Sequence, residues 1–199
     1  MGTFKERVRD VAIATAKVYK QNLVEYEYLV CSRAFAGGYK EIKADGNNFM
    51  HLVGVNSDLS ADEFWNRCLD GTLSEDDFDF AKRGQDAKSV KGSVRQKIQV
   101  LRCVPDIFDL ELRAQEDFRK NRIECAFATS DGSLTLGFAA SGRPKSLMKS
   151  DELSDSAMNV DLVFRRPRKS SNLYSELYHG NRDRLTEYLP LIHDLIDLE

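Results

Sequence analysis

The stretch IECAFATSDGSLTLGFAA, residues 123–140, decides the fold of the second half of the chain. Its two halves, Ile123–Thr129 and Ser133–Ala140, are short runs rich in apolar and β-favouring residues. Between them stands Asp131-Gly132, a dipeptide that favours a tight turn joining antiparallel strands. We therefore predict a β-hairpin over this stretch.

Similar short runs surround this hairpin after Pro105. Ile107–Leu112 and Val160–Arg166 have the length and composition of strands, and we predict that they join the hairpin. Two polar stretches, 149–159 and 165–171, are predicted to be loops. The second half of the chain is thus predicted to form a mostly antiparallel sheet.

The residues before Pro105 carry helix signals instead. Thr3 and Glu6 form a capping box, and apolar residues at helical spacing continue to residue 24. A second capping box, Ser60 with Glu63, begins another predicted helix. Further predicted elements are a hairpin over 25–33 and 39–44, a short helix from Ser74, a basic amphipathic helix over 88–102 and a C-terminal helix from Asn181 that contains Pro190. Helices followed by antiparallel strands are typical of an α+β fold.

The composition predicts a globular protein made of one domain over residues 1–199. Hydrophobic residues make up 42% of the chain and charged residues 31%, which is typical of neither a disordered nor a membrane-embedded protein. No run approaches the roughly 20 apolar residues of a membrane span, and the first residues do not resemble a signal peptide. The cytoplasm is therefore the expected location. Cys31, Cys68, Cys103 and Cys125 are widely spaced and are predicted to be reduced core residues.

Charge is unevenly distributed along the chain. The net charge of minus three argues against a protein that coats nucleic acid nonspecifically. However, residues 58–79 are mostly acidic, whereas residues 82–102, from Lys82 and Arg83 onwards, are mostly basic, and a second basic cluster covers 165–169. Such segregation either creates a local phosphate-binding face or leaves solvated helix faces that neutralise each other.

The sequence contains no motif for a nucleotide cofactor or a metal. Gly37-Gly38 is a bare pair, and neither a Walker-type nor a GxGxxG pattern occurs. There is also no HExxH, no GxSxG and no cluster of carboxylates and histidines at metal-ligand spacing. We therefore expect no cofactor.

Two segments contain the candidate functional residues. His51 stands in the apolar segment Asn48–Gly54, which has the length of a helical turn or of a strand. The segment 137–148 is predicted to be a strand that runs into a loop carrying Arg143, Lys145 and Ser146, which are cations and a hydroxyl donor. The alternatives are a structural core histidine and an ordinary turn with surface charge. His179 and His193 are expected to be exposed or structural.

In order, the segments NFMHLVG (48–54), RQKIQVL (95–101) and RPKSLM (143–148) resemble the successive motifs of a phage-associated branch of the barnase, EndoU, colicin and RelE-like nuclease superfamily. That branch pairs F-x-H-L-x-G with a later lysine and P-[KR]-[ST]-L-L, and Met148 replaces the final leucine. The resemblance covers about residues 20–150. It implies an α+β nuclease fold with N-terminal helices packed on a curved, mostly antiparallel sheet. Residues 1–24 would then be an N-terminal helix, 25–150 the nuclease-like core and 151–199 a C-terminal strand and helix.

The resemblance also implies a substrate and roles for individual residues. RNA supplies its own nucleophile, so cleavage needs a proton acceptor, a proton donor and fixed positive charge. His51 would be the base or acid, because an imidazole ordinarily titrates near pH 6.5. Lys97 would stabilise developing charge, and Ser146 would donate a hydrogen bond to a phosphate oxygen. Arg95, Arg143 and Lys145 would bind the substrate. No metal would be required.

Three hypotheses for the function follow. The first is a metal-independent endoribonuclease that acts as a toxin or phage-defence effector, with RNA as its substrate and an antitoxin or immunity protein as a candidate partner. The second is a catalytically inactive module of the same fold that binds RNA or protein. The third is an enzyme of another class, such as a nucleotidyl or ADP-ribosyl transferase. Convergence of His51, Lys97 and Ser146 on one cleft would favour the first over the second.

Overall fold

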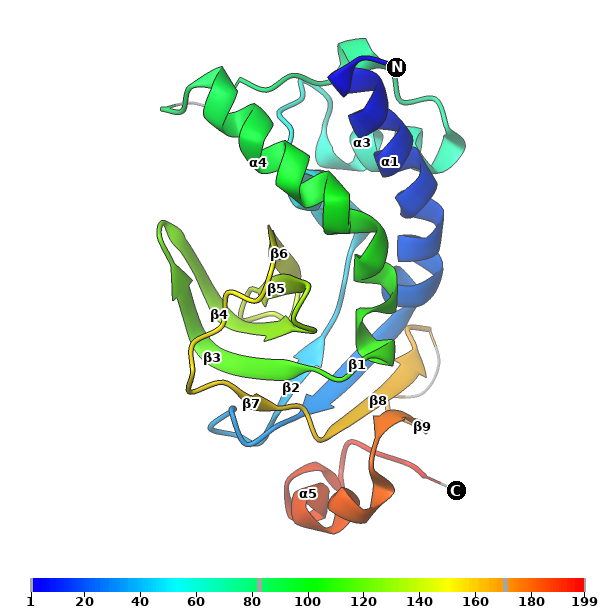
Figure 1. Cartoon of the computed structure of the whole chain (residues 1–199). Helices are drawn as coiled ribbons and strands as arrows, with labels where there is room; N and C mark the ends of the chain where they lie inside the picture. The colour runs from blue at the N-terminus through cyan, green and yellow to red at the C-terminus, as the bar shows by residue number, and fades with distance from the viewer. Residues whose placement is uncertain (1, 82–83, 170–171, 199) are drawn as a thin grey trace.

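Helices and two antiparallel sheets make up the protein, and the helices lie mainly in the first half of the chain (Figure 1). The computed structural model describes residues 2–81, 84–169 and 172–198. Lys82 and Arg83 of the basic run, and residues 170–171 of a predicted loop, lie outside the described residues. No described helix is both long enough and apolar enough to cross a membrane. The α+β fold class is confirmed.

The helices begin where the sequence places their caps. α1 covers Phe4–Tyr19, starts at the predicted capping box and continues as a wide π-helical turn to Val24. α3 covers Ala61–Asp70 and has the second capping box at its start. The basic helix is α4, Ala87–Val100, which packs against α1 and the five-stranded sheet. These signals are local in sequence, which explains why they predict the helices well.

Within the described residues, nine strands form two sheets, where the sequence suggested one. The four-stranded sheet has the order β2-β1-β8-β9, with β1 Tyr26–Cys31, β2 Tyr39–Ile42, β8 Leu162–Pro167 and β9 Glu176–Gly180. The five-stranded sheet has the order β6-β5-β4-β3-β7, with β3 Arg113–Lys120, β4 Ile123–Ser130, β5 Leu134–Phe138, β6 Pro144–Lys149 and β7 Met158–Asn159. Every strand pair is antiparallel. The predicted hairpin at Asp131-Gly132 joins β4 to β5.

The prediction of a strand at Ile107–Leu112 is wrong. After α4, the chain continues as 3-10 helical turns over Leu101–Asp109, and Pro105 lies inside them. Leu101, Val104 and Phe108 are buried along one side of these turns. A short apolar run has the same composition in a buried helical turn as in a strand, so periodicity alone could not distinguish them.

Three further expectations need correction. The predicted loop that carries Lys145 and Ser146 is strand β6, which pairs with β5. Cys103 is exposed, whereas Cys31, Cys68 and Cys125 are buried as predicted. The C-terminal helix α5, Leu185–Ile192, contains Pro190 and ends before the apolar residues 195–196 that were assigned to it.

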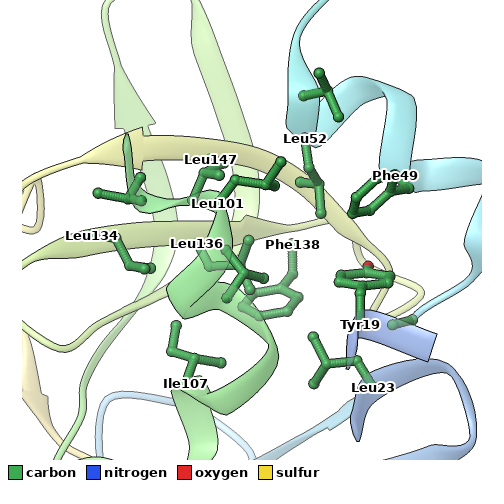
Figure 2. Packing of buried hydrophobic residues seen from close by; sticks show 14 of the residues in the cluster. Tyr19, Leu23, Phe49, Leu52, Leu101, Ile107, Leu134, Leu136, Phe138 and Leu147 are labelled. Carbon is green, nitrogen blue, oxygen red and sulfur yellow. The ribbon is translucent and has the colours of Figure 1, made fainter. Parts of the chain in front are cut away.

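The main core lies where α1, α4 and the short helix α2, Phe49–Val53, meet strands β5 and β6 (Figure 2). Tyr19 of α1 packs against Phe49 of α2 with ring centroids 5.2 Å apart. Leu147 of β6 is buried in the same cluster. The core therefore fixes α2 and β6, which carry His51 and Ser146, relative to each other.

Candidate active site

Helix α2 presents His51 at the surface. The segment that sequence patterns left open between helix and strand is helical, with Phe49, Leu52 and Val53 buried on one side. His51 lies on the other side and is exposed, which excludes the core-histidine alternative. The aromatic contacts of Phe49 with Tyr19 and Trp65 hold the helix in place, with centroid distances of 5.2 Å in both cases.

Lys97 of α4 reaches α2 and contacts its backbone. Its Nζ donates a hydrogen bond to the carbonyl oxygen of His51 at 2.9 Å. On this path the Lys97 side chain passes Gly54, which ends α2 with a φ of 89°. A Cβ atom at Gly54 would lie 2.8 Å from Cδ of Lys97. A glycine at this position therefore allows both the left-handed backbone and the close approach of Lys97.

Lys97 and Ser146 line the same pocket, which has a volume of about 480 Å³. Figure 1 shows α4 and β6 on the same side of the molecule. The residues that line the pocket come mainly from α4, strand β6 and the turn that joins β3 to β4. Its other lining residues are Gln85, Ser93, Gln96, Lys120, Asn121, Ile123, Leu147, Met148, Lys149 and Glu152. His51 does not line this pocket. Its backbone carbonyl is linked to the pocket by the hydrogen bond from Lys97, which does line it.

The charged side chains that line the pocket are mostly basic. Lys97, Lys120 and Lys149 contribute three ammonium groups, and Glu152 contributes a carboxylate that pairs with Lys120 at 2.8 Å. Lys149 Nζ donates to Gln99 Oε1 at 2.7 Å, which directs that lysine towards α4. Such an excess of positive charge favours an anionic ligand.

Ser146 is held on a tightly packed part of the sheet. It is opposite Gly137 in the register of β5 and β6, and it is 8% exposed. A Cβ atom at Gly137 would lie 2.5 Å from Sγ of Cys125, so the strand needs a glycine here. Burial raises the pKa of the Cys125 thiol. A raised pKa makes the Cys125 thiol a poorer nucleophile, because the thiolate is the reactive form.

Arg95 is not brought to this pocket. Residues in an α-helix are about 100° apart around the axis, so Arg95 and Lys97 point in nearly opposite directions. The Arg95 guanidinium instead lies over the ring of Phe4 in α1, 5.3 Å from its centroid. It borders a different hollow, between α1 and α4.

Arg143 and Lys145 also lie outside the pocket lining. Arg143 donates to Asn47 Oδ1 at 2.5 Å and pairs with Asp45 at 3.1 Å, so it ties the segment before α2 to the start of β6. Lys145 Nζ donates to the carbonyl oxygen of Glu124 at 2.7 Å. The register of β5 and β6 shifts beside Lys145, so strand alternation does not fix the side that it faces, and its ammonium is held at β4 by this contact.

Other lining residues were missed by the sequence patterns. Ser93 lies four residues before Lys97 and three residues before Gln96, spacings that place side chains on one face of a helix, so helical geometry could have identified Ser93 and then Gln96. Lys120 and Asn121 lie at the end of β3, a strand with too little apolar character to be recognised. The sequence therefore allows the lining residues on α4 to be predicted, but not those at the end of β3.

A second hollow of about 600 Å³ lies beside β9 and contains His179. His179 Nε2 is 3.6 Å from a carboxylate oxygen of Glu111, and Arg184 in the same lining pairs with Asp161 at 3.4 Å. Within the described ranges, no group of three His, Cys, Asp or Glu side chains is arranged to hold a metal ion.

Comparison with known protein families gives a match over most of the chain. A family model described as "phage-Barnase-EndoU-ColicinE5/D-RelE like nuclease4" matches residues 13–178. No curated protein and no solved structure matches the chain. The matched region includes α2, α4, β6 and the pocket between α4 and the sheet.

Proposed function

Since the chain belongs to the phage Barnase-EndoU-ColicinE5/D-RelE-like nuclease family, we propose that it is a metal-independent endoribonuclease. The observation that carries this proposal is the position of Lys97, which contacts His51 through the backbone and lines a basic pocket together with Ser146. Three residues from segments far apart in the sequence are thereby gathered in one region. The arrangement supplies a proton-transfer group, positive charge and a hydroxyl donor.

RNA cleavage in this region would proceed by transesterification. The 2′-oxygen attacks the adjacent phosphorus, the bond from phosphorus to the 5′-oxygen breaks, and the products are a 2′,3′-cyclic phosphate and a free 5′-hydroxyl. One group must remove the proton of the 2′-hydroxyl, and another must protonate the leaving 5′-oxygen. His51 is exposed and carries an imidazole, which is suited to either transfer.

Lys97 and Ser146 would act on the phosphate. Positive charge and donors that are fixed before the reaction stabilise the negative charge that develops on the phosphoryl oxygens. Lys97 is half-buried and anchored to α2, and Ser146 is almost buried on a strand, so neither group has much freedom to reorganise. Lys120 and Lys149 would add positive charge at the rim.

Arg143 takes a different part in this proposal from the one implied by family resemblance. Its contacts with Asp45 and Asn47 join the segment before α2 to the start of β6. We therefore assign it as a positioning residue that holds His51 at a fixed place relative to Ser146. Arg95 is assigned to a separate surface, the hollow between α1 and α4.

The biological role follows from the same proposal. We propose that the protein acts in the cytoplasm as a toxin or phage-defence effector, and that an antitoxin or immunity protein restrains it. Induced expression of the wild type should arrest growth, whereas His51→Ala should not. Equal growth of both strains, with equal amounts of protein, would contradict the toxin role.

A chimeric oligonucleotide tests the chemistry directly. The substrate is a DNA strand that contains a single ribonucleotide, and the control is the same strand with a 2′-deoxynucleotide at that position. Transesterification predicts cleavage immediately 3′ of the ribonucleotide and an intact control. Cleavage of both strands would indicate attack by water instead. Binding of both without cleavage would support the non-catalytic alternative.

A further inference from the structure

A hollow between the first turn of α1 and α4 has an aromatic floor. Phe4 of α1 and Phe80 are stacked, with centroids 5.2 Å apart and planes inclined by 29°. The hollow has a volume of about 470 Å³ and is lined by Thr3, Phe4, Lys5, Glu75, Phe80, Lys91 and Arg95. Its floor is therefore apolar, and its rim on α4 is basic.

The cations at this rim are exposed and sit above the rings. Arg95 lies 5.3 Å from the centroid of Phe4, and Lys91 lies 5.5 Å from the centroid of Phe80. Among the described lining residues, Glu75 is the only carboxylate, and it pairs with Arg9 at 3.0 Å. Positive charge at the rim is thus left available to an anionic ligand.

We propose that this hollow binds a stretch of single-stranded nucleic acid next to the cleavage pocket. This inference rests on the proposed function, because it takes RNA as the ligand. Proteins that bind single strands combine aromatic side chains, on which bases stack, with cations that follow the phosphates. Arginine planes also stack against bases. The half-buried Phe4 supplies the aromatic face, the buried Phe80 supports it from behind, and Lys91 and Arg95 supply the cations.

The two sites share helix α4, and the proposed RNA path runs across this helix from one site to the other. Lys97 and Ser93 face the cleavage pocket, whereas Lys91 and Arg95 face the aromatic hollow. α4 separates them, and a helix with its side chains is about 10–12 Å across. A single strand that leaves the pocket across α4 therefore reaches the hollow within a few nucleotides. The hollow would then bind RNA without contacting the scissile phosphate.

The test uses a ligand that cannot be cleaved by transesterification. A fluorescein-labelled 12-nucleotide 2′-O-methyl oligouridylate is titrated with the intact protein at several salt concentrations, and anisotropy reports binding. Each phosphate contact contributes about 0.7 to the slope of log affinity against log salt for a single strand. Arg95→Gln and Lys91→Gln should each lower that slope by about this amount. Lys17→Gln, an exposed lysine elsewhere on α1, is the matched control and should keep the wild-type slope.

Stacking is tested separately with Phe4→Leu, which keeps an apolar side chain but removes the aromatic face. It should weaken binding roughly 5-fold to 100-fold, the range expected for loss of one stacked base. Circular dichroism of each variant checks that it is folded. Wild-type affinity and slope in all three variants would overturn the inference.

Failure of this inference and failure of the proposed function can be told apart. If the wild type cuts RNA but the Phe4, Lys91 and Arg95 variants bind the oligonucleotide with wild-type affinity and salt slope, the inference fails and the proposed function stands. If the variants lose binding as expected but the wild type cuts no RNA, the inference stands and the proposed function fails. A wild type that binds an acidic protein but not the oligonucleotide would overturn the inference in favour of a protein partner.

Discussion

The ammonium of Lys97 donates a hydrogen bond to the backbone carbonyl of His51, over a distance of 2.9 Å. This contact links α4 to α2, two helices that pack on the same edge of the five-stranded sheet. It places a cation of the basic pocket beside the exposed histidine. The geometry of the proposed site therefore depends on how closely Lys97 can pass the backbone at the end of α2.

Gly54→Ala tests this dependence, with Gly71→Ala as its matched control. Both glycines follow the last residue of a helix with a positive φ, 89° and 74° respectively. An alanine in this conformation costs roughly 1–2 kcal/mol at either site. Only at Gly54 would the new Cβ meet another side chain, at 2.8 Å from Cδ of Lys97, whereas nothing lies within 4 Å at Gly71.

We expect both variants to lose similar stability in urea denaturation, but only Gly54→Ala to lose RNA cleavage, by about tenfold or more. Placed in a Lys97→Ala background, Gly54→Ala should cause no further loss of cleavage, because the Lys97 side chain that it would displace is already absent. Equal cleavage rates for the Gly54 and Gly71 variants would show that the position of Lys97 does not matter.

His51→Ala should lower RNA cleavage by about 100-fold or more, the range expected for loss of a general acid or base. Because His51 is exposed, the free energy of unfolding should change by no more than about 0.5 kcal/mol. His193→Ala removes an exposed histidine at the end of α5 and should cleave like the wild type. An unfolded His51→Ala protein, or one with full activity, would remove His51 from the mechanism.

Ser146→Ala should reduce turnover by up to about 10²–10³-fold, as removal of a preorganised donor does in other enzymes. The substitution deletes one oxygen at an almost buried position on β6, so the strand should remain paired with β5. Ser141→Ala, at an exposed position in the turn before β6, is the control. The measurement is the single-turnover rate of RNA cleavage by Ser146→Ala and by Ser141→Ala. Similar rates would exclude a role for the Ser146 hydroxyl in cleavage.

The free energy of unfolding should depend on pH because of the contact that Asp86 makes at the start of α4. Hydrogen bonds from the hydroxyl and backbone amide of Ser89 hold the pKa of Asp86 below its ordinary value, and they cap the start of α4. Because the folded pKa is the lower one, this stabilisation is present above the unfolded pKa and is lost as pH falls through the folded pKa. Asp86→Asn should therefore be less stable than the wild type at pH 7, with a difference that shrinks below about pH 4. Urea denaturation across pH would contradict this if the difference stayed constant.

Much of the fold was predictable because its signals are local. The capping boxes at Thr3 and Ser60 and the turn at Asp131-Gly132 each act within a few residues, and each marks an element boundary in the structure. β3 could not be predicted, because its sequence RAQEDFRK buries only Ala114 and Phe118. The pairing of β8 with β1 depends on residues more than a hundred positions apart, so no local pattern could reveal two sheets.

The candidate site was predictable only in part for the same reason. Its residue types and motif order indicated His51, Lys97 and Ser146, but the sequence contains no signal for the contact between Lys97 and the backbone of α2. The separation of Arg95 from Lys97 follows from helical geometry and could have been anticipated. The partners of Arg143 could not, because Asp45 and Asn47 are almost a hundred residues away in the sequence.

The most direct test is to incubate the purified protein with total RNA in EDTA and to identify the ends of the products. We predict discrete fragments that carry 2′,3′-cyclic phosphate and 5′-hydroxyl ends, formed by the wild type and not by His51→Ala. Intact RNA in EDTA with cleavage restored by a divalent cation, or fragments that carry 5′-phosphate ends, would contradict a metal-independent transesterification.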